Sequence, residues 1–327
     1  MSMAMFKVYI IGAGQIGSRH LQALKKTSFP LDISVIDPSP ESLKLAAERY
    51  DTISVEREIH RISFIKNMAS GESIDLAIVA TTSDVRAGIL KQLIKKNKVK
   101  YLILEKILFN KRKDYEIIQK IITKNEIKAW VNCPIRIMPF YRNLRDKLGS
   151  NILFYAHSGK PVLMGSAIHY IDYMSYLTRS LDFKVDTSYL DPRPISSKRK
   201  GFFEITGTLI VKFKNKGQAI FSFSNKGSSP IIIDISDDSK FRTIIKDSEN
   251  KAWTSDRENN WQWKETDMQF LMQSQMTNLL VENIIGTGNC NLITYKDSAK
   301  LHLSFLESLR LFLNKHSGKK YNYYPFT

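Results

Sequence analysis

A run of glycines directly after a short apolar segment most constrains how this chain can fold. Residues Phe6–Ile11 are mostly apolar, and Gly12-Ala13-Gly14-Gln15-Ile16-Gly17 follows them at once. Beyond this run, Leu21 and Leu24 continue an apolar face that begins at Ile16, with the spacing of a helix. This order predicts a buried strand, a tight turn and an amphipathic helix, which together begin a βαβ unit.

The three glycines have the spacing of a turn that binds a dinucleotide. Gly12 permits the tight turn, Gly14 lets a pyrophosphate approach the backbone, and Gly17 lets the helix pack closely on the strand. The unpaired N–H groups at the helix N-terminus favour phosphate oxygens. A strand–helix turn that binds no ligand is the alternative interpretation of the same glycines.

A carboxylate ends the second predicted strand and indicates which dinucleotide would bind. Asp37 lies twenty residues after Gly17 and can accept hydrogen bonds from both hydroxyls of an adenosine ribose. The same carboxylate would repel a 2′-phosphate, and no arginine is present in the following Pro38-Ser39-Pro40. The sequence therefore favours NAD over NADP as the cofactor.

Short apolar strands alternate with amphipathic helices through the first half of the chain. These strands lack polar alternation, which is typical of a parallel sheet covered by helices on both faces. The pattern predicts a doubly wound α/β domain. The predicted strands are Phe6–Ile11, Ile33–Ile36, Ile53–Val55, Leu76–Ala80, Tyr101–Glu105 and Ala129–Asn132, with helices at Glu41–Arg49, after Asp84 and around Tyr115–Ile122.

The second half alternates apolar and polar residues, as antiparallel strands with one buried face do. Leu209–Phe213 and Ala219–Phe223 flank Lys216-Gly217 and predict a hairpin. We therefore expect an α/β fold class, with an N-terminal Rossmann-type doubly wound domain over 1–133 and a C-terminal α+β domain with an open antiparallel sheet over 134–327. Further strands are predicted at Ile231–Ile235, Phe241–Ile245 and Trp261–Trp263, and closing helices at Met268–Ile285 and Asp297–Leu313.

Net charge is the unusual feature of the composition. Among 327 residues, Lys+Arg number 49 and Asp+Glu number 32, which gives +17. Such an excess is compatible with a nucleic acid, an acidic membrane, an anionic small molecule or a lysine-rich solvated surface. Lysine pairs such as Lys95-Lys96 favour the solvated surface, and arginine clusters interleaved with aromatic residues are absent. We expect neither a nucleic-acid partner nor a membrane partner.

The two cysteines, Cys133 and Cys290, fit neither a metal-binding spacing nor a disulfide framework. We therefore expect no metal site and a reducing, cytoplasmic location. No apolar stretch approaches the length of about 18 residues that a membrane span needs. The residues before the first strand do not have the pattern of a signal sequence.

Polar residues end several of the predicted parallel strands. Thr81-Thr82 follows the fourth strand, Glu105-Lys106 ends the fifth, and Asn132 ends the sixth. The carboxyl ends of parallel strands share one edge of a sheet, where open α/β folds bind their ligands. Helix capping near Ser83 and a solvated Lys106 are the ordinary alternatives.

Taken together, these motifs resemble the glucose–fructose oxidoreductase / inositol dehydrogenase / MocA (Gfo/Idh/MocA) family over nearly the whole chain. The segment Ala167-Ile168-His169-Tyr170-Ile171-Asp172 is similar to the family's Gly-x-His-x-x-Asp pattern, with Ala167 in place of glycine. Two positions depart from the family. Ile107 replaces the proline of a Glu-Lys-Pro motif, and Gly165 replaces a carboxylate that many members carry four residues before the histidine.

The resemblance implies that Lys106 contacts the reacting hydroxyl and that His169 acts as acid or base. Histidine suits proton transfer near neutral pH, and a nearby ammonium stabilises a developing alkoxide. Asp172, one helical turn after His169, is expected to orient the imidazole or contact substrate. Arg136 and Lys160 are further substrate candidates, with a core histidine and an interdomain salt bridge of Arg136 as alternatives. The expected cofactor-binding residues are Gly12, Gly14, Gln15, Ile16, Gly17, Asp37, Thr81, Thr82, Glu105, Lys106 and Asn132.

The function expected from these features is NAD-dependent hydride transfer between nicotinamide and a hydroxyl or keto carbon of a sugar or sugar derivative. Nucleotide sugars and nonulosonates are the narrower candidates, and an anionic sugar agrees with the net charge. The alternative is a catalytically weakened NAD-binding sensor or scaffold, which the departures at Ile107 and Gly165 motivate. The resemblance also implies a homodimer or homotetramer formed through the open face of the antiparallel sheet.

Overall fold

The computed structural model describes residues 5–327 and divides into two compact units. The first unit consists of residues 5–109, 113–132 and 271–295, and the second of residues 110–112, 133–270 and 296–327. The chain passes from the first unit to the second after Asn132, next to the boundary expected at 133. The return of 271–295 to the first unit differs from the two contiguous domains that the sequence pattern predicts.

The first unit contains a seven-stranded sheet in the order β17-β6-β5-β4-β1-β2-β3. Its pairs are parallel except for β17 with β6, and β1 lies between β2 and β4, so that Val8 is opposite both Ile33 and Leu76. From β1 the chain adds β2 and β3 on one side of the sheet and then β4, β5 and β6 on the other. Doubly wound folds bind ligands at the point where the strand order reverses in this way. The strands are β1 (Phe6–Ile11), β2 (Leu31–Ile36), β3 (Arg61–Ile65), β4 (Ser73–Val79), β5 (Lys98–Leu104), β6 (Lys128–Val131) and β17 (Ile293–Thr294).

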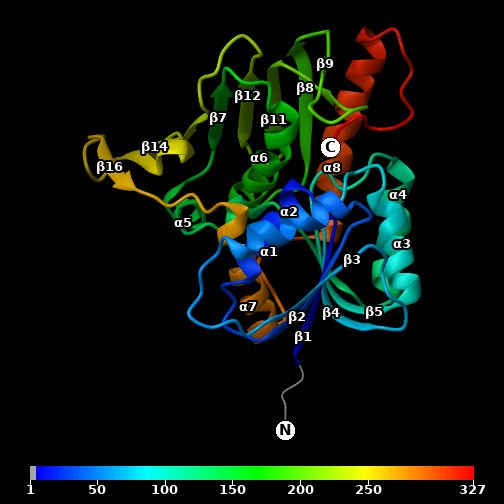
Figure 1. The fold of residues 1–327 in the computed structure, drawn as a ribbon. Coiled ribbons are helices and arrows are strands. Elements are labelled where there is room, and N and C mark those ends of the chain that lie inside the picture. The colour runs from blue at the N-terminus through cyan, green and yellow to red at the C-terminus, as the bar shows by residue number, and fades with distance from the viewer. Residues whose placement is uncertain (1–4) are drawn as a thin grey trace. The chain divides into compact units, whose positions relative to one another are not determined.

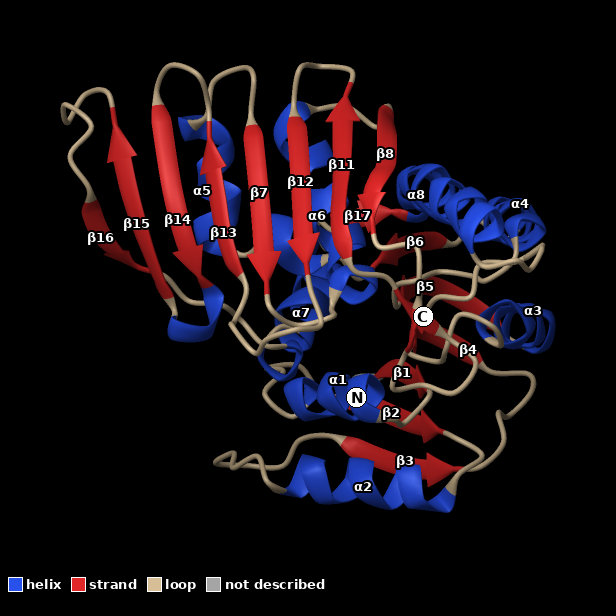
Figure 2. Ribbon diagram, turned by 90° about the horizontal axis from the view of Figure 1, so that it is seen from above, coloured by secondary structure: helices blue, strands red, loops and turns tan. Residues whose placement is uncertain are grey.

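Helices cover both faces of this sheet, as the lack of polar alternation in its strands predicts. Figure 2 shows α3 and α4 on one face, with α1 and α7 on the other. The central residues of β1 and β4 are fully buried between these layers, among them Val8, Ile10 and Leu76. The helices are α1 (Gln15–Leu24), α2 (Pro40–Asp51), α3 (Arg86–Lys96), α4 (Arg112–Lys124) and α7 (Thr277–Thr287).

The third strand lies later in the chain than the sequence predicts. Residues 53–55 are in turns and coil, and β3 is Arg61–Ile65 instead. β3 pairs only with β2, at the edge of the sheet, and three of its five residues are exposed. Because an edge strand is buried on fewer sides, it lacks the continuous apolar run by which the other strands are recognised.

The second unit contains an eight-stranded sheet in the order β16-β15-β14-β13-β7-β12-β11-β8. Its pairs are antiparallel except for β7 with β12, so that the predicted antiparallel sheet includes one parallel step. Figure 1 shows α6 packed along this sheet. The strands are β7 (Leu153–Ser158), β8 (Phe183–Leu190), β11 (Gly207–Phe213), β12 (Gln218–Phe223), β13 (Ile232–Ser236), β14 (Phe241–Lys246), β15 (Lys251–Asp256) and β16 (Lys264–Asp267).

Smaller elements complete the second unit. A short two-stranded sheet pairs β9 with β10, and helix α6 begins after a loop that follows β7. Helix α8 begins at the last residue of the first unit and runs through the second. These elements are β9 (Ile195–Ser196), β10 (Phe203–Glu204), α5 (Pro139–Lys147), α6 (Leu163–Thr178), α8 (Tyr295–His316) and the 3₁₀ turns η1 (Pro134–Ile137) and η2 (Asp247–Glu249).

The predicted hairpin is confirmed as β11 and β12, with Leu209 opposite Phe221. One face of the hairpin is fully buried and includes Leu209, Val211 and Phe221. The other face is partly exposed, and there the hydroxyl groups of Thr208 and Ser222 lie 3.0 Å apart. The structure thereby settles which face of these strands belongs to the core.

Two predictions for the end of the second half are wrong. Trp261–Trp263 is a turn between β15 and β16, and both tryptophans are exposed. Their aromatic character suggests a strand, but neither side chain is packed in the core. The helix predicted from Met268 begins at Thr277, after coil and the 3₁₀ turn η3 (Gln273–Gln275). The apolar residues before Thr277 lie in an irregular segment. Apolar spacing alone does not distinguish such a segment from a helix.

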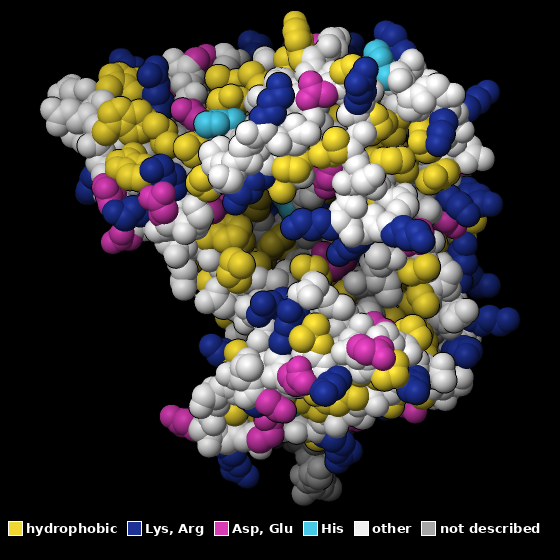
Figure 3. Space-filling view, turned by 45° about the horizontal axis from the view of Figure 1, so that its top comes forward, with side chains coloured by type: hydrophobic (Ala, Val, Ile, Leu, Met, Phe, Trp, Pro, Cys, Tyr) yellow, Lys and Arg dark blue, Asp and Glu magenta, His cyan; other side chains and the backbone are white. Residues whose placement is uncertain are grey.

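Basic side chains are spread over the surface. Figure 3 shows lysine and arginine side chains distributed across the visible face and interspersed with acidic ones. Within residues 5–327, no helix has both the length and the apolar character needed to span a bilayer.

Candidate active site

The glycine turn of the first unit has the shape that its sequence predicts. Gly12 has φ +96°, a left-handed conformation that residues with a Cβ rarely adopt. A Cβ at Gly17 would lie 1.7 Å from the carbonyl oxygen of Gly12, so only glycine fits there. A Cβ at Gly14 would meet nothing within 4 Å. Protein packing therefore requires glycine at the first and third positions, and the open space at Gly14 leaves its backbone accessible to a ligand.

Asp37 connects the glycine turn to the end of β2. Its Oδ2 accepts a hydrogen bond from the amide of Ala13 at 2.7 Å, and its Oδ1 accepts one from the amide of Ser39 at 2.9 Å. Each carboxylate oxygen has lone pairs left for a further donor. The half-buried carboxylate thus has a structural role in the turn and could still accept hydrogen bonds from ribose hydroxyls.

The first turn of α1 carries two more of the expected cofactor residues. The side-chain oxygen of Gln15 accepts a hydrogen bond from Arg49 of α2 at 2.6 Å, and Arg49 also donates to Ser18 at 2.6 Å. Ile16 follows and is half-buried. Arg49 therefore fixes the exposed side of this turn, a contact that the sequence does not indicate.

Two buried acceptors lie at the carboxyl edge of the same sheet. The Oγ1 atom of Thr81, after β4, and the Oδ1 atom of Asn132, after β6, are buried, and within residues 5–327 neither has a hydrogen-bond partner. Buried polar atoms without partners are rare in proteins and call for an explanation. Together with the open backbone at Gly14, these unpartnered atoms suit a dinucleotide bound at this edge of the sheet. The hydroxyl and amide groups of the dinucleotide would then donate hydrogen bonds to them.

A buried polar network holds Glu105, which ends β5. His20 Nε2 lies 3.0 Å from a Glu105 carboxylate oxygen, and the side-chain amide of Asn132 donates to the same oxygen. Gln273 and Thr277 complete the network by contacting Asn132 and His20. Burial raises the pKa of Glu105, but the His20 and Asn132 hydrogen bonds and the charges of His20 and Lys106 outweigh it and lower the pKa to about 2. The carboxylate preceding Lys106 is therefore ionised and fixed in place.

Arg86 ties together the two turns that follow β4 and β5. It lies on the first turn of α3 with only 2% of its surface exposed. Its guanidinium donates hydrogen bonds to the carbonyl oxygens of Thr81, Glu105 and Ile107, and to that of Leu108 at 3.0 Å. Isoleucine does not restrict its own φ as a proline would. At position 107 the hydrogen bond from Arg86 to the carbonyl oxygen restrains the loop after Lys106 instead.

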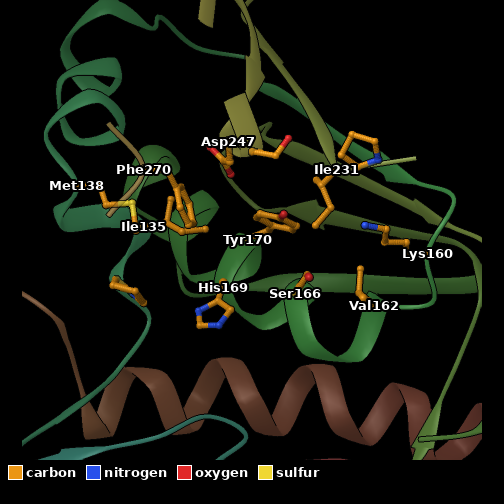
Figure 4. A pocket seen from close by; sticks show the side chains of 13 residues that line it. Ile135, Met138, Lys160, Val162, Ser166, His169, Tyr170, Ile231, Asp247 and Phe270 are labelled. Carbon is orange, nitrogen blue, oxygen red and sulfur yellow. The ribbon is translucent and has the colours of Figure 1, made fainter. Parts of the chain in front are cut away.

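A cavity of about 380 Å³ lies within the second unit. His169 of α6 is half-buried in its lining, and Lys160 reaches it from the loop between β7 and α6. Apolar residues, including Ile135, Met138 and Phe270, form much of the remaining wall. Figure 4 shows these side chains around the cavity. The polar residues of the lining are Lys160, Ser166, His169, Tyr170, Asp247 and Ser248.

Arg136 and Asp172 bind each other and are absent from this lining. Two nitrogens of the Arg136 guanidinium each lie 2.8 Å from an Asp172 carboxylate oxygen, and Asp172 is 1% exposed. Burial raises the pKa of Asp172 to about 6, while the Arg136 charge opposes that rise. The structure therefore pairs these two side chains with each other, and their predicted contacts with His169 or substrate stay predictions.

Two residues around the cavity are not indicated by the sequence. Asp247, at the start of η2, lines the cavity, and burial raises the pKa of its carboxyl group to about 6. The buried Tyr141 of α5 donates a hydrogen bond to Asp247 at 2.6 Å. Asp247 follows a strand in an ordinary-looking turn sequence, so no spacing relates it to His169. Only its perturbed environment marks it as a candidate.

Solved structures with the same fold include proteins with different roles. An oxidoreductase from Agrobacterium radiobacter, solved with NAD⁺, L-tartaric acid and magnesium, is 16% identical with a TM-score of 0.69, covering 92% of this chain and 94% of that one. A UDP-N-acetylglucosamine 3-dehydrogenase from Acidithiobacillus ferrooxidans is 12% identical with a TM-score of 0.66, covering 93% and 97%. A super-repressor mutant of Gal80p from Saccharomyces cerevisiae is 14% identical with a TM-score of 0.68, covering 95% and 96%.

These likenesses concern the fold, because the identities are low. No curated protein sequence matches the chain. A family model does match it: residues 6–133 fit an oxidoreductase family with an NAD-binding Rossmann fold, GFO_IDH_MocA. The matched segment includes the glycine turn, Asp37, Glu105 and Asn132. Residues 6–133 therefore match the NAD-binding Rossmann domain of this oxidoreductase family.

Proposed function

We propose that the protein transfers a hydride between NAD and a hydroxyl or keto carbon of a sugar or sugar derivative. The observation that carries the proposal is the position of His169, a half-buried histidine in the lining of a cavity large enough for a small molecule. The NAD-binding domain supplies the other requirement of the reaction. Nicotinamide, when bound, takes up or supplies the hydride.

The proposed chemistry of the chain's own residues is a proton transfer with stabilisation of charge on oxygen. His169 takes the hydroxyl proton as general base when the alcohol is oxidised, and returns it in the reverse direction. Lys106 donates a hydrogen bond to the same oxygen, stabilising the alkoxide that develops as the proton leaves. The anchored Glu105 and the Arg86 contacts hold the loop that carries Lys106.

A sugar substrate is supported by the mixed lining of the cavity. Hydroxyl-bearing and charged side chains stand beside an apolar wall, which suits the polar groups and C–H faces of a sugar ring. Lys160 and the net charge of +17 favour an anionic derivative. One protein of the same fold is a UDP-N-acetylglucosamine 3-dehydrogenase, so nucleotide sugars belong in the test, together with nonulosonates.

Asp37 is proposed to select NAD over NADP. Its charge would repel a 2′-phosphate, and Asp37→Asn removes that charge while keeping an acceptor for the Ala13 amide. We expect this variant to bind NAD about 10- to 100-fold more weakly, since it loses hydrogen bonds to a charged group. The ratio of its affinities for NAD and NADP should therefore decrease. Titration of both cofactors by fluorescence measures the change, and an unaltered ratio would argue against this role.

The decisive experiment is a screen of free and nucleotide-linked sugars with NAD, read as NADH absorbance. Uronates, hexosamines and nonulosonates form the core of the panel. With any active substrate, His169→Asn should lower kcat by about 100- to 10,000-fold and Lys106→Ala by about 100-fold or more. NADH affinity should be kept in the His169 variant. Full turnover in either variant would overturn the proposed mechanism.

The second candidate function is an NAD-binding sensor or scaffold with little turnover. Gly165 leaves α6 without the carboxylate that the family resemblance implies, and Ile107 replaces the expected proline. The fold itself is compatible with regulation, because a super-repressor mutant shares it. NADH binding without hydride exchange on any sugar of the panel would favour this candidate. Loss of turnover in Lys106→Ala with cofactor affinity retained would exclude it.

We further propose a homodimer or homotetramer in a reducing cytoplasmic setting. The partly exposed face of β11 and β12, with Ile210 and Ile220, supports the oligomer. The presence of only two cysteines, in no disulfide-framework spacing, supports the setting. Light scattering after size exclusion should give two or four times the chain mass of 37.6 kDa. Ile220→Lys should shift that mass toward the monomer, and an unchanged mass would place the interface elsewhere.

A further inference from the structure

The cavity of the second unit contains a carboxylate that the proposed chemistry does not use. Asp247 lies at the start of η2, directly after β14, whereas His169 comes from α6. Both side chains line the same cavity, and Figure 4 shows them on these different elements with Tyr170 between them. Position 165 of α6 is glycine, so that helix offers no carboxylate four residues before His169. Asp247 supplies an acidic group to the cavity from another part of the chain.

Asp247 is held in place by one hydrogen bond. Its Oδ1 accepts from the hydroxyl of Tyr141 at 2.6 Å, and Tyr141 is itself fully buried. The hydroxyl of Tyr173 donates to the Tyr141 carbonyl oxygen at 2.7 Å, which fixes the backbone that presents Tyr141. Because both the tyrosine and its supporting residue are buried in the core, the carboxylate has a defined orientation.

In the described part of the chain, the second oxygen of Asp247 has no protein donor, and it is not among the fully buried unpartnered atoms. Within residues 5–327 no hydrogen bond to Oδ2 is formed, although the side chain is half-buried. A partly desolvated carboxylate with a single donor is destabilised relative to one in water, and its raised pKa reflects that burial. A ligand in the cavity that carries a hydrogen-bond donor can take the place of water at this accessible oxygen.

The surroundings indicate what kind of donor the ligand carries. Lys160 and His169 line the same cavity, and two basic groups disfavour a cationic ligand. A neutral hydroxyl group can donate to Oδ2 without that repulsion. The apolar wall, with Val162, Ile231 and Phe270, suits the C–H face of a ring rather than a second charge. The cavity volume of about 380 Å³ lies within the range typical of small-molecule sites.

We infer that Asp247 is a substrate-binding carboxylate that accepts a hydrogen bond from a ring hydroxyl of a monosaccharide unit, with Tyr141 as its positioning residue. This inference rests on the proposed function for the sugar class of the ligand, and it is independent of hydride transfer. Asp247 thereby determines which hydroxyl pattern the cavity accepts, while His169 exchanges the proton of the reacting hydroxyl.

The test measures sugar binding separately from turnover. Saturation-transfer NMR with the full-length protein and NADH, using D-glucuronate, N-acetyl-D-glucosamine and N-acetylneuraminate, gives dissociation constants without requiring catalysis. Asp247→Asn should weaken binding of any sugar that the wild type binds by about 10- to 100-fold, the range for a hydrogen bond to a charged group. For a sugar that turns over, KM should rise more than kcat falls.

A matched control and a positioning variant complete the experiment. Asp234→Asn removes another half-buried carboxylate of the second unit, on β13 and outside the cavity lining, and should leave binding unchanged. Tyr141→Phe should shift the acid limb of sugar binding to higher pH, because the hydrogen bond that lowers the Asp247 pKa is lost. The other titratable groups that line the cavity with Asp247 are Tyr170, His169 and Lys160, and Lys246 and Glu249 lie beside it in the chain. Tyr141→Phe leaves all of these in place.

Each outcome decides the inference. Wild-type affinity in Asp247→Asn would overturn it, as would an equal loss in Asp234→Asn, since the effect would then not be specific to the cavity. No binding of any of the three sugars to the wild type would also overturn it, because the ligand class would be wrong. Sugar binding that depends on Asp247 but occurs without hydride exchange would support the inference while contradicting the proposed function.

Discussion

The carboxyl edge of the first sheet and the cavity of the second unit are built on different principles. The edge is made largely of backbone: a glycine turn, the first turn of α1 and the ends of neighbouring parallel strands. The cavity is made of side chains from well-separated segments, around Ile135, Lys160, His169, Asp247 and Phe270. A backbone site follows from local turns and from the ends of regularly repeated strands, whereas a side-chain site depends on which distant segments pack together.

The buried charges of the two regions differ in the same way. Glu105 is satisfied by several hydrogen bonds, and its pKa is lowered to about 2. Asp247 has one hydrogen bond, and its pKa is raised to about 6. The carboxylate of the first region is fully satisfied by the protein, whereas that of the second region has, among residues 5–327, one oxygen without a protein donor. Substitutions at the carboxyl edge of the first sheet should therefore lower stability first. Substitutions in the cavity of the second unit should weaken substrate binding first.

The largest effect is expected at the glycine turn. Gly17→Ala places a Cβ 1.7 Å from the Gly12 oxygen, so the strand and helix must separate. We expect the first unit to lose at least about 4 kcal/mol of stability and its NADH binding. Gly88→Ala in α3 is the control, since its Cβ would meet nothing within 4 Å, and it should stabilise by about 0.5–1 kcal/mol. Denaturant titration measures the stability of each variant, and fluorescence measures its NADH binding. Equal stability and equal NADH affinity in the two variants would refute the steric argument.

The next effect concerns the buried pair of His20 and Glu105. Glu105→Gln removes one charge and should destabilise the protein by about 3 kcal/mol at neutral pH. Because the folded-state pKa of Glu105 is lowered from 4.5 to about 2, its stabilisation is complete above pH 4.5 and is lost as the pH falls toward 2. The difference between wild type and variant should therefore vanish across that window.

Unfolding titrations from pH 7 to pH 2 follow this loss. The control Glu116→Gln, on the exposed side of α4, should stay within about 0.5 kcal/mol of wild type throughout. A difference for Glu105→Gln that persists at pH 2 would show that packing, rather than charge, stabilises this site.

A smaller effect is expected for Arg136 and Asp172, which lie outside the cavity lining. Asp172→Asn leaves the Arg136 charge without its partner and should cost about 2 kcal/mol. The double variant Arg136→Met with Asp172→Leu should recover most of that loss, because both charges are gone. Denaturation midpoints test the stability, and KM for an active sugar should not change in the double variant. A large rise in KM in the double variant would support the predicted contact of Arg136 or Asp172 with substrate.

The smallest effect is expected at Lys160, an exposed residue at the cavity. Lys160→Gln should raise KM for anionic sugars by about 2- to 5-fold at low salt and leave stability unchanged. The difference should shrink as salt screens the charge. Lys320→Gln, an exposed lysine outside the cavity, is the control. Equal effects of both substitutions would assign the preference to net charge alone.

The sequence predicts some elements well and others poorly for physical reasons. Buried parallel strands such as Leu76–Ala80 have continuous apolar runs, and the hairpin of Leu209–Phe213 has clean alternation, so both are found close to their predicted places. The edge strand Arg61–Ile65 is half exposed and has no such signal. The exposed tryptophans Trp261 and Trp263 have the composition of a strand without its packing.

Among site residues, the same division holds. Gly12 and Gly17 have conformational and steric requirements that are visible from their spacing, and the structure contains both. His169 and Lys160 line one cavity, and their roles there stay predictions. Asp172 shares a helix with His169, but its partner is Arg136. Spacing along a helix indicates which residues share a face, and it does not indicate which neighbour from another element arrives there.

By itself, the sequence determined the glycine turn, the parallel sheet it begins and the carboxylate of Asp37, because each depends on interactions with nearby residues or on a repeated apolar pattern. The tertiary structure alone decided the pairing of Arg136 with Asp172, the contacts of Arg86 with two turns, and the placement of Asp247 and His169 in the lining of one cavity. These depend on long-range packing: a buried polar group binds whichever partner the folded core brings within reach, and that partner can lie anywhere in the chain.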